Sequence, residues 1–191
     1  MNRLIEKDIQ TACEVLRKGG VILYPTDTVW GIGCDATCAE AVARIYEIKK
    51  RSDSKSLLVL LDSATKLDFY INDLPNIALD LIEVSDQPLT IVYSGAKNVA
   101  PNLIAGDGTL GIRITNEAFS RELCRRFGKP LVSTSANISG QPAPENFAKI
   151  NDEIIRSVDY TVNYRRNDNR IARPSAIIKI GPGGEVQIIR E

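Results

Sequence analysis

The feature that most constrains the fold is a set of short apolar runs separated by amphipathic stretches. Residues 57–61 read Leu-Leu-Val-Leu-Leu, with no polar residue in alternation. A run of this length is typical of a strand that is covered on both faces. Residues 8–18, by contrast, carry apolar residues at helical spacing and end at Gly19-Gly20. The two patterns together predict a sheet with helices packed on both of its faces.

The two patterns alternate along the whole chain, without repeats or low-complexity tracts. This alternation predicts an α/β fold with three layers, a mixed sheet between helices, in a single domain over residues 1–191. A Thr37–Glu40 capping box is expected to open the second helix, and residues 94–109 are expected to form a loop. The expected strands are 21–24, 57–61, 89–93, 110–114, 130–133 and a hairpin of 176–180 with 186–190; the other expected helices are 8–18, 75–84, 117–127 and 145–157.

The composition is that of an ordinary globular protein. Hydrophobic residues make up 43% of the 191 residues and charged residues 25%. Lysine plus arginine and aspartate plus glutamate number 24 each, so no overall field favours nucleic acid or a membrane surface. No apolar run approaches the roughly 20 residues of a membrane span, and the first residues lack a signal-peptide core. We therefore expect a cytoplasmic protein.

The chain contains no histidine, which excludes several kinds of active site. Ser-His-Asp and Cys-His nucleophilic machinery is impossible, as is a histidine general base. The cysteines form no Cys-x-x-Cys pair, so buried, reduced thiols are expected rather than a metal site. They are Cys13, Cys34, Cys38 and Cys124. Any chemistry must depend on positioning, fixed charge, hydroxyl groups or a bound metal.

Three expected strands end in polar loops of a similar kind. Hydroxyl, amide or carboxylate side chains follow the strands at 24–31 and 131–137, and residues 173–175 precede the final hairpin. Ligands of α/β proteins favour crevices beyond strand ends, where such groups hold phosphate or carboxylate oxygens. Each loop alone is also explained by ordinary turn chemistry. The three together favour a binding site.

Two groups of basic residues are candidates for anion binding. Lys49 and Arg51 follow the second helix, where on the residues alone solvated charge or a helix C-cap is the favoured interpretation. Arg113 lies inside the apolar run 110–114. A guanidinium at that position is either exposed at a sheet edge or paired with a carboxylate of the protein or of a ligand.

Five segments together resemble the YrdC family, the threonylcarbamoyl-adenylate synthases, from about residue 8 to the end. Their order and spacing carry the resemblance, because any one segment alone is a weak signal. They are Tyr-Pro-Thr-Asp-Thr-Val-Trp-Gly-Ile-Gly-Cys-Asp-Ala (24–36), Lys49-x-Arg51, Gly-Thr-Leu-Gly-Ile-Arg (108–113), Pro-Leu-Val-Ser-Thr-Ser-Ala-Asn-Ile-Ser-Gly (130–140) with the Ser135-x-Asn137 motif, and Pro-Ser-Ala-Ile-Ile (174–178).

The resemblance implies a mixed, twisted sheet flanked by helices around a large concave cavity. It also implies a nucleotidyltransferase that converts L-threonine, bicarbonate or CO2, and ATP into L-threonylcarbamoyl-AMP and diphosphate, for the N6-threonylcarbamoyladenosine modification of tRNA. Magnesium would come with the ATP phosphates, without direct protein ligands, and the product would pass to a threonylcarbamoyl-transferase complex. The alternative is a non-catalytic module of the same fold that binds double-stranded RNA or tRNA, against which the zero net charge argues mildly.

Carried over position by position, the resemblance assigns the two halves of the site, with Lys49 and Arg51 as the catalytic cations. The sequence departs from the family pattern at Ser52 and Ser56, where prolines are usual, and at Ala143, where a hydroxyl is common. These departures affect the expectations for Lys55 and for one phosphate contact. The implied ATP-binding residues are Lys49, Arg51, Lys55, Thr109, Ser135, Asn137 and Arg190; the implied threonine-binding residues are Thr28, Arg113, Ser133 and Ser175.

Overall fold

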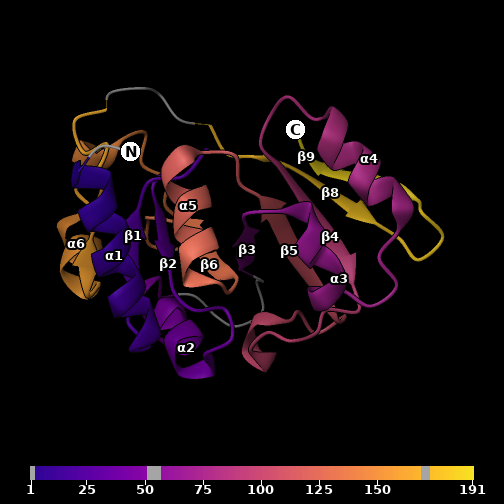
Figure 1. Cartoon of the computed structure of the whole chain (residues 1–191), viewed down its shortest axis with the longest axis horizontal. Coiled ribbons are helices and arrows are strands. Elements are labelled where there is room, and N and C mark those ends of the chain that lie inside the picture. The colour runs from indigo at the N-terminus through magenta and orange to yellow at the C-terminus, as the bar shows by residue number, and fades with distance from the viewer. Residues whose placement is uncertain (1–2, 51–56, 169–172) are drawn as a thin grey trace.

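The computed structural model of the protein describes residues 3–50, 57–168 and 173–191 (Figure 1). Within these ranges, nine strands form one sheet in the order β7-β1-β2-β6-β3-β5-β4-β8-β9. The β1–β7, β3–β5 and β4–β8 pairs are parallel and the other neighbours antiparallel, which confirms a mixed sheet. The strands are β1 Ile22–Tyr24, β2 Gly31–Gly33, β3 Leu58–Leu61, β4 Leu89–Ser94, β5 Thr109–Ile114, β6 Leu131–Ser135, β7 Tyr160–Thr161, β8 Ala176–Ile180 and β9 Val186–Arg190.

Helices fill the connections between most of these strands. In Figure 1, α1 and α5 lie side by side over one half of the sheet, and α4 lies near β8 and β9 at the other end. No helix in the described ranges is long and apolar enough to cross a membrane. The helices are α1 Arg3–Arg17, α2 Ala39–Ile48, α3 Leu67–Tyr70, α4 Asn76–Val84, α5 Ala118–Phe127 and α6 Asp152–Ser157, with short 3-10 turns at Ala64–Lys66, Pro101–Leu103 and Phe147–Lys149.

The core lies on both faces of the sheet. Along β3, Val59 and Leu61 belong to one buried cluster, which also includes the apolar face of α2. Leu60 points into a second cluster, formed with α1 and α5. Successive side chains of a strand point to opposite faces, so an unbroken apolar run is what two cores require. The expected three-layer architecture is therefore confirmed.

The expected capping box at the start of α2 is wrong. The N-cap residue is Cys38, and its side chain makes no capping hydrogen bond. Thr37 instead donates its hydroxyl and its backbone N–H to Asp35 Oδ1, at 2.7 and 2.8 Å. Lys129 Nζ holds the other oxygen of this buried carboxylate at 2.7 Å. An anionic acceptor two residues away outcompetes the capping geometry for the threonine hydroxyl.

Two further expectations need correction. Residues 145–157 do not form one helix but a 3-10 turn followed by α6, because the Asn151 side chain accepts from Glu153 N at 2.8 Å and starts a new helix. Cys38, expected to be buried, is only half-buried. The other three thiols are buried, and burial raises the pKa of Cys13, Cys34 and Cys124.

Strand β2 was not expected from the sequence, because two of its three residues are glycines. Its place in the sheet, between β1 and β6, explains them. A Cβ on Gly33 would lie 2.5 Å from the Val132 carbonyl oxygen and 2.7 Å from the Tyr24 ring. Only glycine leaves room here for both the Tyr24 ring and the β6 backbone. The connection between β1 and β2 contains the first polar loop, Thr26 to Val29.

Candidate functional site

A cavity of about 360 Å³ opens along β4, β5 and β6 and the loops beside them. It brings together segments that are far apart in the sequence: the loop after β1, the residues before β8, and the C-terminal end of β9. Apolar side chains of Leu57, Leu58 and Val92 complete its walls. The expected site residues that line it are Thr28, Thr109, Arg113, Ser133, Ser135, Ser175 and Arg190.

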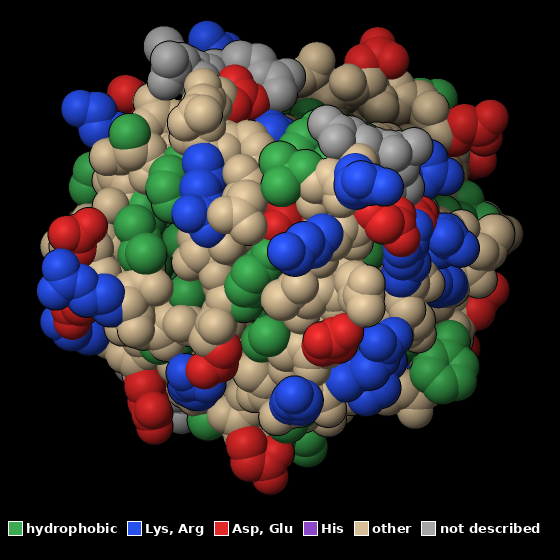
Figure 2. All heavy atoms as spheres, turned by 60° about the vertical axis from the view of Figure 1, so that its left-hand side comes forward, with side chains coloured by type: hydrophobic (Ala, Val, Ile, Leu, Met, Phe, Trp, Pro, Cys, Tyr) green, Lys and Arg blue, Asp and Glu red, His purple; other side chains and the backbone are tan. Residues whose placement is uncertain are grey.

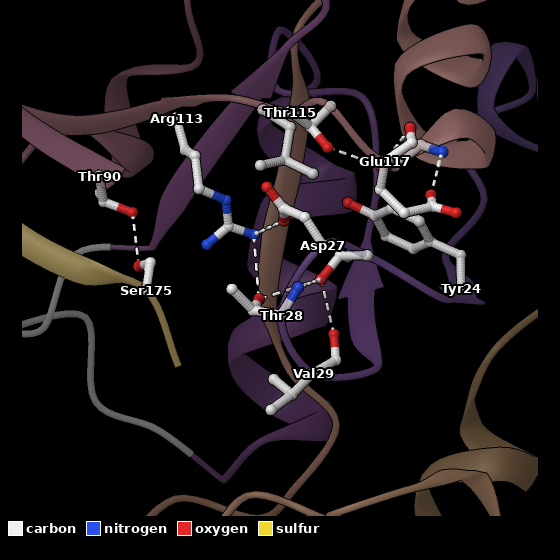
Figure 3. Close-up of polar contacts among 12 residues, drawn as sticks. Tyr24, Asp27, Thr28, Val29, Thr90, Arg113, Thr115, Glu117 and Ser175 are labelled. Atoms are coloured by element: carbon white, nitrogen blue, oxygen red, sulfur yellow. Dashed lines mark hydrogen bonds and ion pairs between the residues drawn. The ribbon is translucent and has the colours of Figure 1, made fainter. Parts of the chain in front are cut away.

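Arg113 is a buried cation in the wall of this cavity. Strand β5 lies between β3 and β4, and the arginine side chain is 3% exposed, so the edge-exposed alternative is wrong. Its Nη2 donates to Thr28 Oγ1 at 3.2 Å and lies 3.0 Å from Asp27 Oδ1 (Figure 3). Burial lowers the pKa of Arg113, and Asp27 opposes that shift. Its Nε is buried without a hydrogen-bond partner among the described residues, so the guanidinium can still donate to a ligand.

The turn after β1 places Thr28 against the guanidinium. Thr26 Oγ1 donates to Val29 O at 2.7 Å and accepts from Thr28 N at 3.1 Å. The same atom lies 3.0 Å from Thr28 Oγ1, which continues the chain of contacts to Arg113. These bonds are ordinary turn chemistry, and they also fix the hydroxyl that faces the cavity. At this loop the turn-chemistry interpretation is confirmed, and the same turn places the Thr28 hydroxyl at the cavity.

A second hydroxyl pair lies on the other side of Arg113 in Figure 3. Thr90 Oγ1 and Ser175 Oγ are 2.8 Å apart, and both residues are 2% exposed. Arg190 Nε and Nη2 donate to the Ser175 carbonyl at 3.0 and 2.8 Å, so β9 anchors the residue before β8. Thr90 was missed by the sequence analysis. A polar residue inside the apolar run 89–93 was the available signal, because a fully buried hydroxyl needs a partner.

Ser133 and Thr109 complete the hydroxyl lining. Ser133 lies on β6 opposite Leu58 of β3 and is 4% exposed. Thr109 starts β5, and its hydroxyl donates to Asp107 Oδ1 at 2.6 Å. This hydrogen bond, followed by that of Lys179, lowers the pKa of Asp107 to about 2. The Asp107 carboxylate therefore stays ionised and holds the Thr109 hydroxyl in place at the cavity.

Lys49 and Asn137 do not line the cavity; they shape the turn that follows β6. Lys49 is the C-cap residue of α2, which confirms the helix C-cap interpretation. Its side chain is buried, so the interpretation as solvated charge is wrong. Its Nζ donates to the carbonyls of Ser135 and Asn137 at 2.6 and 2.7 Å. The Asn137 amide in turn donates to the Gln141 carbonyl at 2.7 Å. The turn presents Ser135 to the cavity.

The remaining expected residues divide into those inside and outside the described ranges. Arg51 and Lys55, with Ser52 and Ser56, lie outside the described residues. Ala143 lines the cavity at the place where a hydroxyl is common in the family. No group of three or more acidic, cysteine or histidine side chains in the described part is placed to hold a metal ion.

Several basic side chains on the surface form ion pairs. On α5, Arg125 Nη2 lies 2.6 Å from Glu122 Oε1, and Arg126 forms ion pairs with both Glu122 and Glu6. Figure 2 shows basic and acidic side chains interspersed on the face that includes the left-hand side of Figure 1. Such a surface resembles a solvated, mixed-charge surface more than a groove for a nucleic-acid backbone.

Comparison with known proteins finds a family model and curated relatives that agree with each other. The Sua5/YciO/YrdC family model, described as "Telomere recombination", matches residues 14–191. A threonylcarbamoyl-AMP synthase of Pseudoalteromonas translucida is 35% identical over 175 residues, covering 90% of this chain and 92% of the relative. The corresponding protein of Pseudomonas savastanoi pv. phaseolicola is 34% identical over 176 residues, covering 92% and 94%.

Solved structures agree in fold. P. abyssi Sua5 complexed with L-threonine has a TM-score of 0.79 and 25% identity over 90% of this chain. This chain spans only 50% of that Sua5 chain. E. coli YciO has a TM-score of 0.81 and 24% identity, covering 100% of this chain and 91% of YciO, and supports the fold alone. The family match and the curated relatives both span most of the sequence. The chain therefore belongs to the Sua5/YciO/YrdC family.

Proposed function

We propose that the protein is a threonylcarbamoyl-AMP synthase, a nucleotidyltransferase acting as one domain over residues 1–191. It would convert L-threonine, bicarbonate or CO2, and ATP into L-threonylcarbamoyl-AMP and diphosphate. The observation that carries the proposal is Arg113, a buried guanidinium with free donor capacity in a cavity lined by hydroxyl groups. The curated relatives of similar length, named as such synthases, support the same assignment.

The threonine half of the proposed site is the part around Arg113. A planar guanidinium matches a carboxylate with two parallel hydrogen bonds, so Arg113 would hold the threonine carboxylate. Thr28, Ser133 and Ser175 would surround the rest of the amino acid, and their hydroxyls can donate and accept. All three are nearly buried, which strengthens each hydrogen bond and raises the cost of leaving one unpaired.

The nucleotide half is proposed at Thr109, Ser135, Asn137 and Arg190, with Arg51, Lys49 and Lys55. The threonine amine would first capture CO2 as a carbamate. A carbamate oxygen would then attack the α-phosphorus of ATP as the bond to the β-phosphate oxygen breaks and diphosphate leaves. Such a step needs alignment and charge neutralisation rather than a histidine base. Arg51 and Lys49 are the proposed catalytic cations, and the Lys49 charge lies beside the Ser135 turn.

Magnesium fits this scheme as a companion of ATP. The described residues that line the cavity include two arginines, several hydroxyls and apolar groups, but no carboxylate. Magnesium prefers carboxylate, water and phosphate oxygens. The ion would therefore enter on the ATP phosphates, without direct protein ligands.

The proposal extends to the surroundings of the reaction. We place the protein in the cytoplasm, as the first enzyme of tRNA N6-threonylcarbamoyladenosine synthesis, handing its product to a threonylcarbamoyl-transferase complex. Direct contact with tRNA is part of the same proposal. A non-catalytic RNA-binding role has no support from the paired surface charges of α5.

The test is diphosphate release from ATP with different amino acids. Threonine with bicarbonate should support release, and valine, which is similar in shape but lacks the hydroxyl, should support at least tenfold less. The reason is that a buried polar partner left unpaired costs about 1–3 kcal/mol. Equal turnover with both amino acids would remove the threonine assignment. No release with any amino acid, together with RNA binding, would favour the non-catalytic alternative.

A further inference from the structure

Asp27 is a largely buried carboxylate at the site, and neither the sequence motifs nor the proposed chemistry assigns it a role. It lies in the turn after β1, between the two hydroxyl residues Thr26 and Thr28. Its Oδ1 is 3.0 Å from Arg113 Nη2, and its side chain is 11% exposed. Among the described residues, it is the one carboxylate within ion-pair distance of Arg113.

Asp27 approaches the guanidinium from the side opposite the Thr90–Ser175 hydroxyl pair. Figure 3 shows Asp27 and the Thr90–Ser175 pair on opposite sides of Arg113. Asp27 lines two neighbouring cavities of about 460 and 810 Å³, whereas Arg113 lines the cavity that contains Ser175. A ligand carboxylate beside Ser175 would therefore not displace Asp27. The guanidinium would lie between the two carboxylates.

Each charge of the pair depends on the other. Burial raises the pKa of Asp27, and Arg113 opposes the shift. Removing one partner of such a pair leaves an uncompensated buried charge, which is strongly destabilising. The pair also leaves the arginine partly neutralised before any ligand arrives. Two carboxylates on one guanidinium repel each other, so the first weakens the binding of the second.

We propose that Asp27 is a positioning residue with two effects on Arg113, an inference that rests on the proposed function. It holds Nη2 in place, so that the remaining donors of the guanidinium face the cavity. Its negative charge moderates the affinity of Arg113 for the substrate carboxylate, so that the empty site is stable and the bound amino acid can be released.

The test compares Asp27→Asn with Asp27→Ala by calorimetric titration of threonine. Asparagine keeps an oxygen beside Nη2 but removes the charge, so threonine should bind more tightly, on the order of tenfold. The same variant should have a lower melting temperature without ligand and a larger rise when threonine is added. Asp27→Ala removes the orienting oxygen as well, and should bind threonine more weakly than Asp27→Asn does.

Two controls separate this role from a general effect on folding. Asp8 is a buried carboxylate outside the cavity that accepts from Tyr160, Asn163 and Tyr164. Asp8→Asn should lower the melting temperature without changing threonine affinity. In an Arg113→Gln background, adding Asp27→Asn should raise stability, because Asp27 no longer has a cationic partner there, and this keeps a stability test of the pair available if the single variant is poorly folded.

A deaminated analogue, 3-hydroxybutyrate, separates failure of this inference from failure of the proposed function. Its carboxylate should also bind more tightly to Asp27→Asn than to the wild-type protein. If neither ligand binds the folded variant more tightly, the inference is wrong. If wild-type protein fails to bind threonine while the variant gains affinity for 3-hydroxybutyrate, the proposed function is wrong and the role of Asp27 stands.

Discussion

Arg113 and Lys49 are both buried cations beside the same cavity, yet their surroundings differ. Arg113 stands on a central strand, faces one carboxylate, and has an Nε without a partner in the described part of the chain. The Lys49 ammonium is bound by two backbone carbonyls of the turn after β6. A cation with donors left over is suited to hold a ligand directly, whereas a cation bonded to backbone carbonyls also fixes the shape of the loop beside the ligand.

This difference predicts that substitutions in one half of the cavity weaken threonine binding and substitutions in the other half weaken ATP binding. The largest effect is expected at Arg113. Arg113→Lys should weaken threonine binding on the order of a hundredfold, because a lysine cannot reproduce the bidentate geometry and the loss amounts to about 2–4 kcal/mol. ATP binding should change little. Calorimetric titration of each substrate measures both, and a variant that lost ATP but kept threonine would reverse the assignment of the halves.

A smaller effect is expected from Lys49→Met, on the opposite substrate. The carbonyls of Ser135 and Asn137 would lose a buried charged donor, at a cost of about 1–3 kcal/mol, and the turn would shift. ATP affinity should fall about tenfold or more while threonine affinity is nearly kept. The matched control is Lys50→Met, which removes an exposed ion pair with Glu153 and should stay within about 0.5 kcal/mol of wild type. A selective loss of threonine binding in Lys49→Met would contradict the comparison.

The smallest effect tests the hydroxyl side of the threonine half. Thr90→Val keeps the shape of the side chain but leaves Ser175 without its partner at 2.8 Å, at a cost of about 1 kcal/mol. Threonine affinity should fall several-fold. Thr115→Val is the control, because Thr115 forms an equivalent buried pair with Ser120, at 2.7 Å, away from the cavity. If both variants lost stability equally and neither lost affinity, Thr90 would be structural only.

Most strands were predictable, because a strand that is buried on both faces has a continuous apolar sequence. The run 57–61 became β3 with a core on each side. The apolar run around Arg113 left two positions open, exposed at an edge or paired with a carboxylate, and only the sheet order decides for the buried one. The hidden strand β2 was not predictable from periodicity. Gly33 is required by the Tyr24 ring and the Val132 carbonyl, which only the folded sheet brings together.

The site was predictable as a set of residues more than as a set of contacts. Seven of the residues expected from the resemblance line one cavity. Their partners were not visible in the sequence. Asp27 lies in the first family segment, next to Thr28, but nothing in the sequence pairs it with Arg113, and Thr90 meets Ser175 only through the β4–β8 pairing. Contacts between distant segments depend on sheet order, which local patterns do not encode.

In the proposed reaction, threonine, carbon dioxide and ATP are joined in this cavity. Tracing ¹³C from bicarbonate into the nucleotide product tests this directly. The protein is incubated with ATP, magnesium, threonine and ¹³C-bicarbonate, and the nucleotide products are analysed by mass spectrometry. We expect an adenylate whose mass shows both the ¹³C label and the threonine group, formed together with diphosphate. At limiting threonine, Arg113→Lys should form much less of it. Diphosphate release with no labelled adenylate, or a labelled product formed equally well by Arg113→Lys, would contradict the proposed reaction.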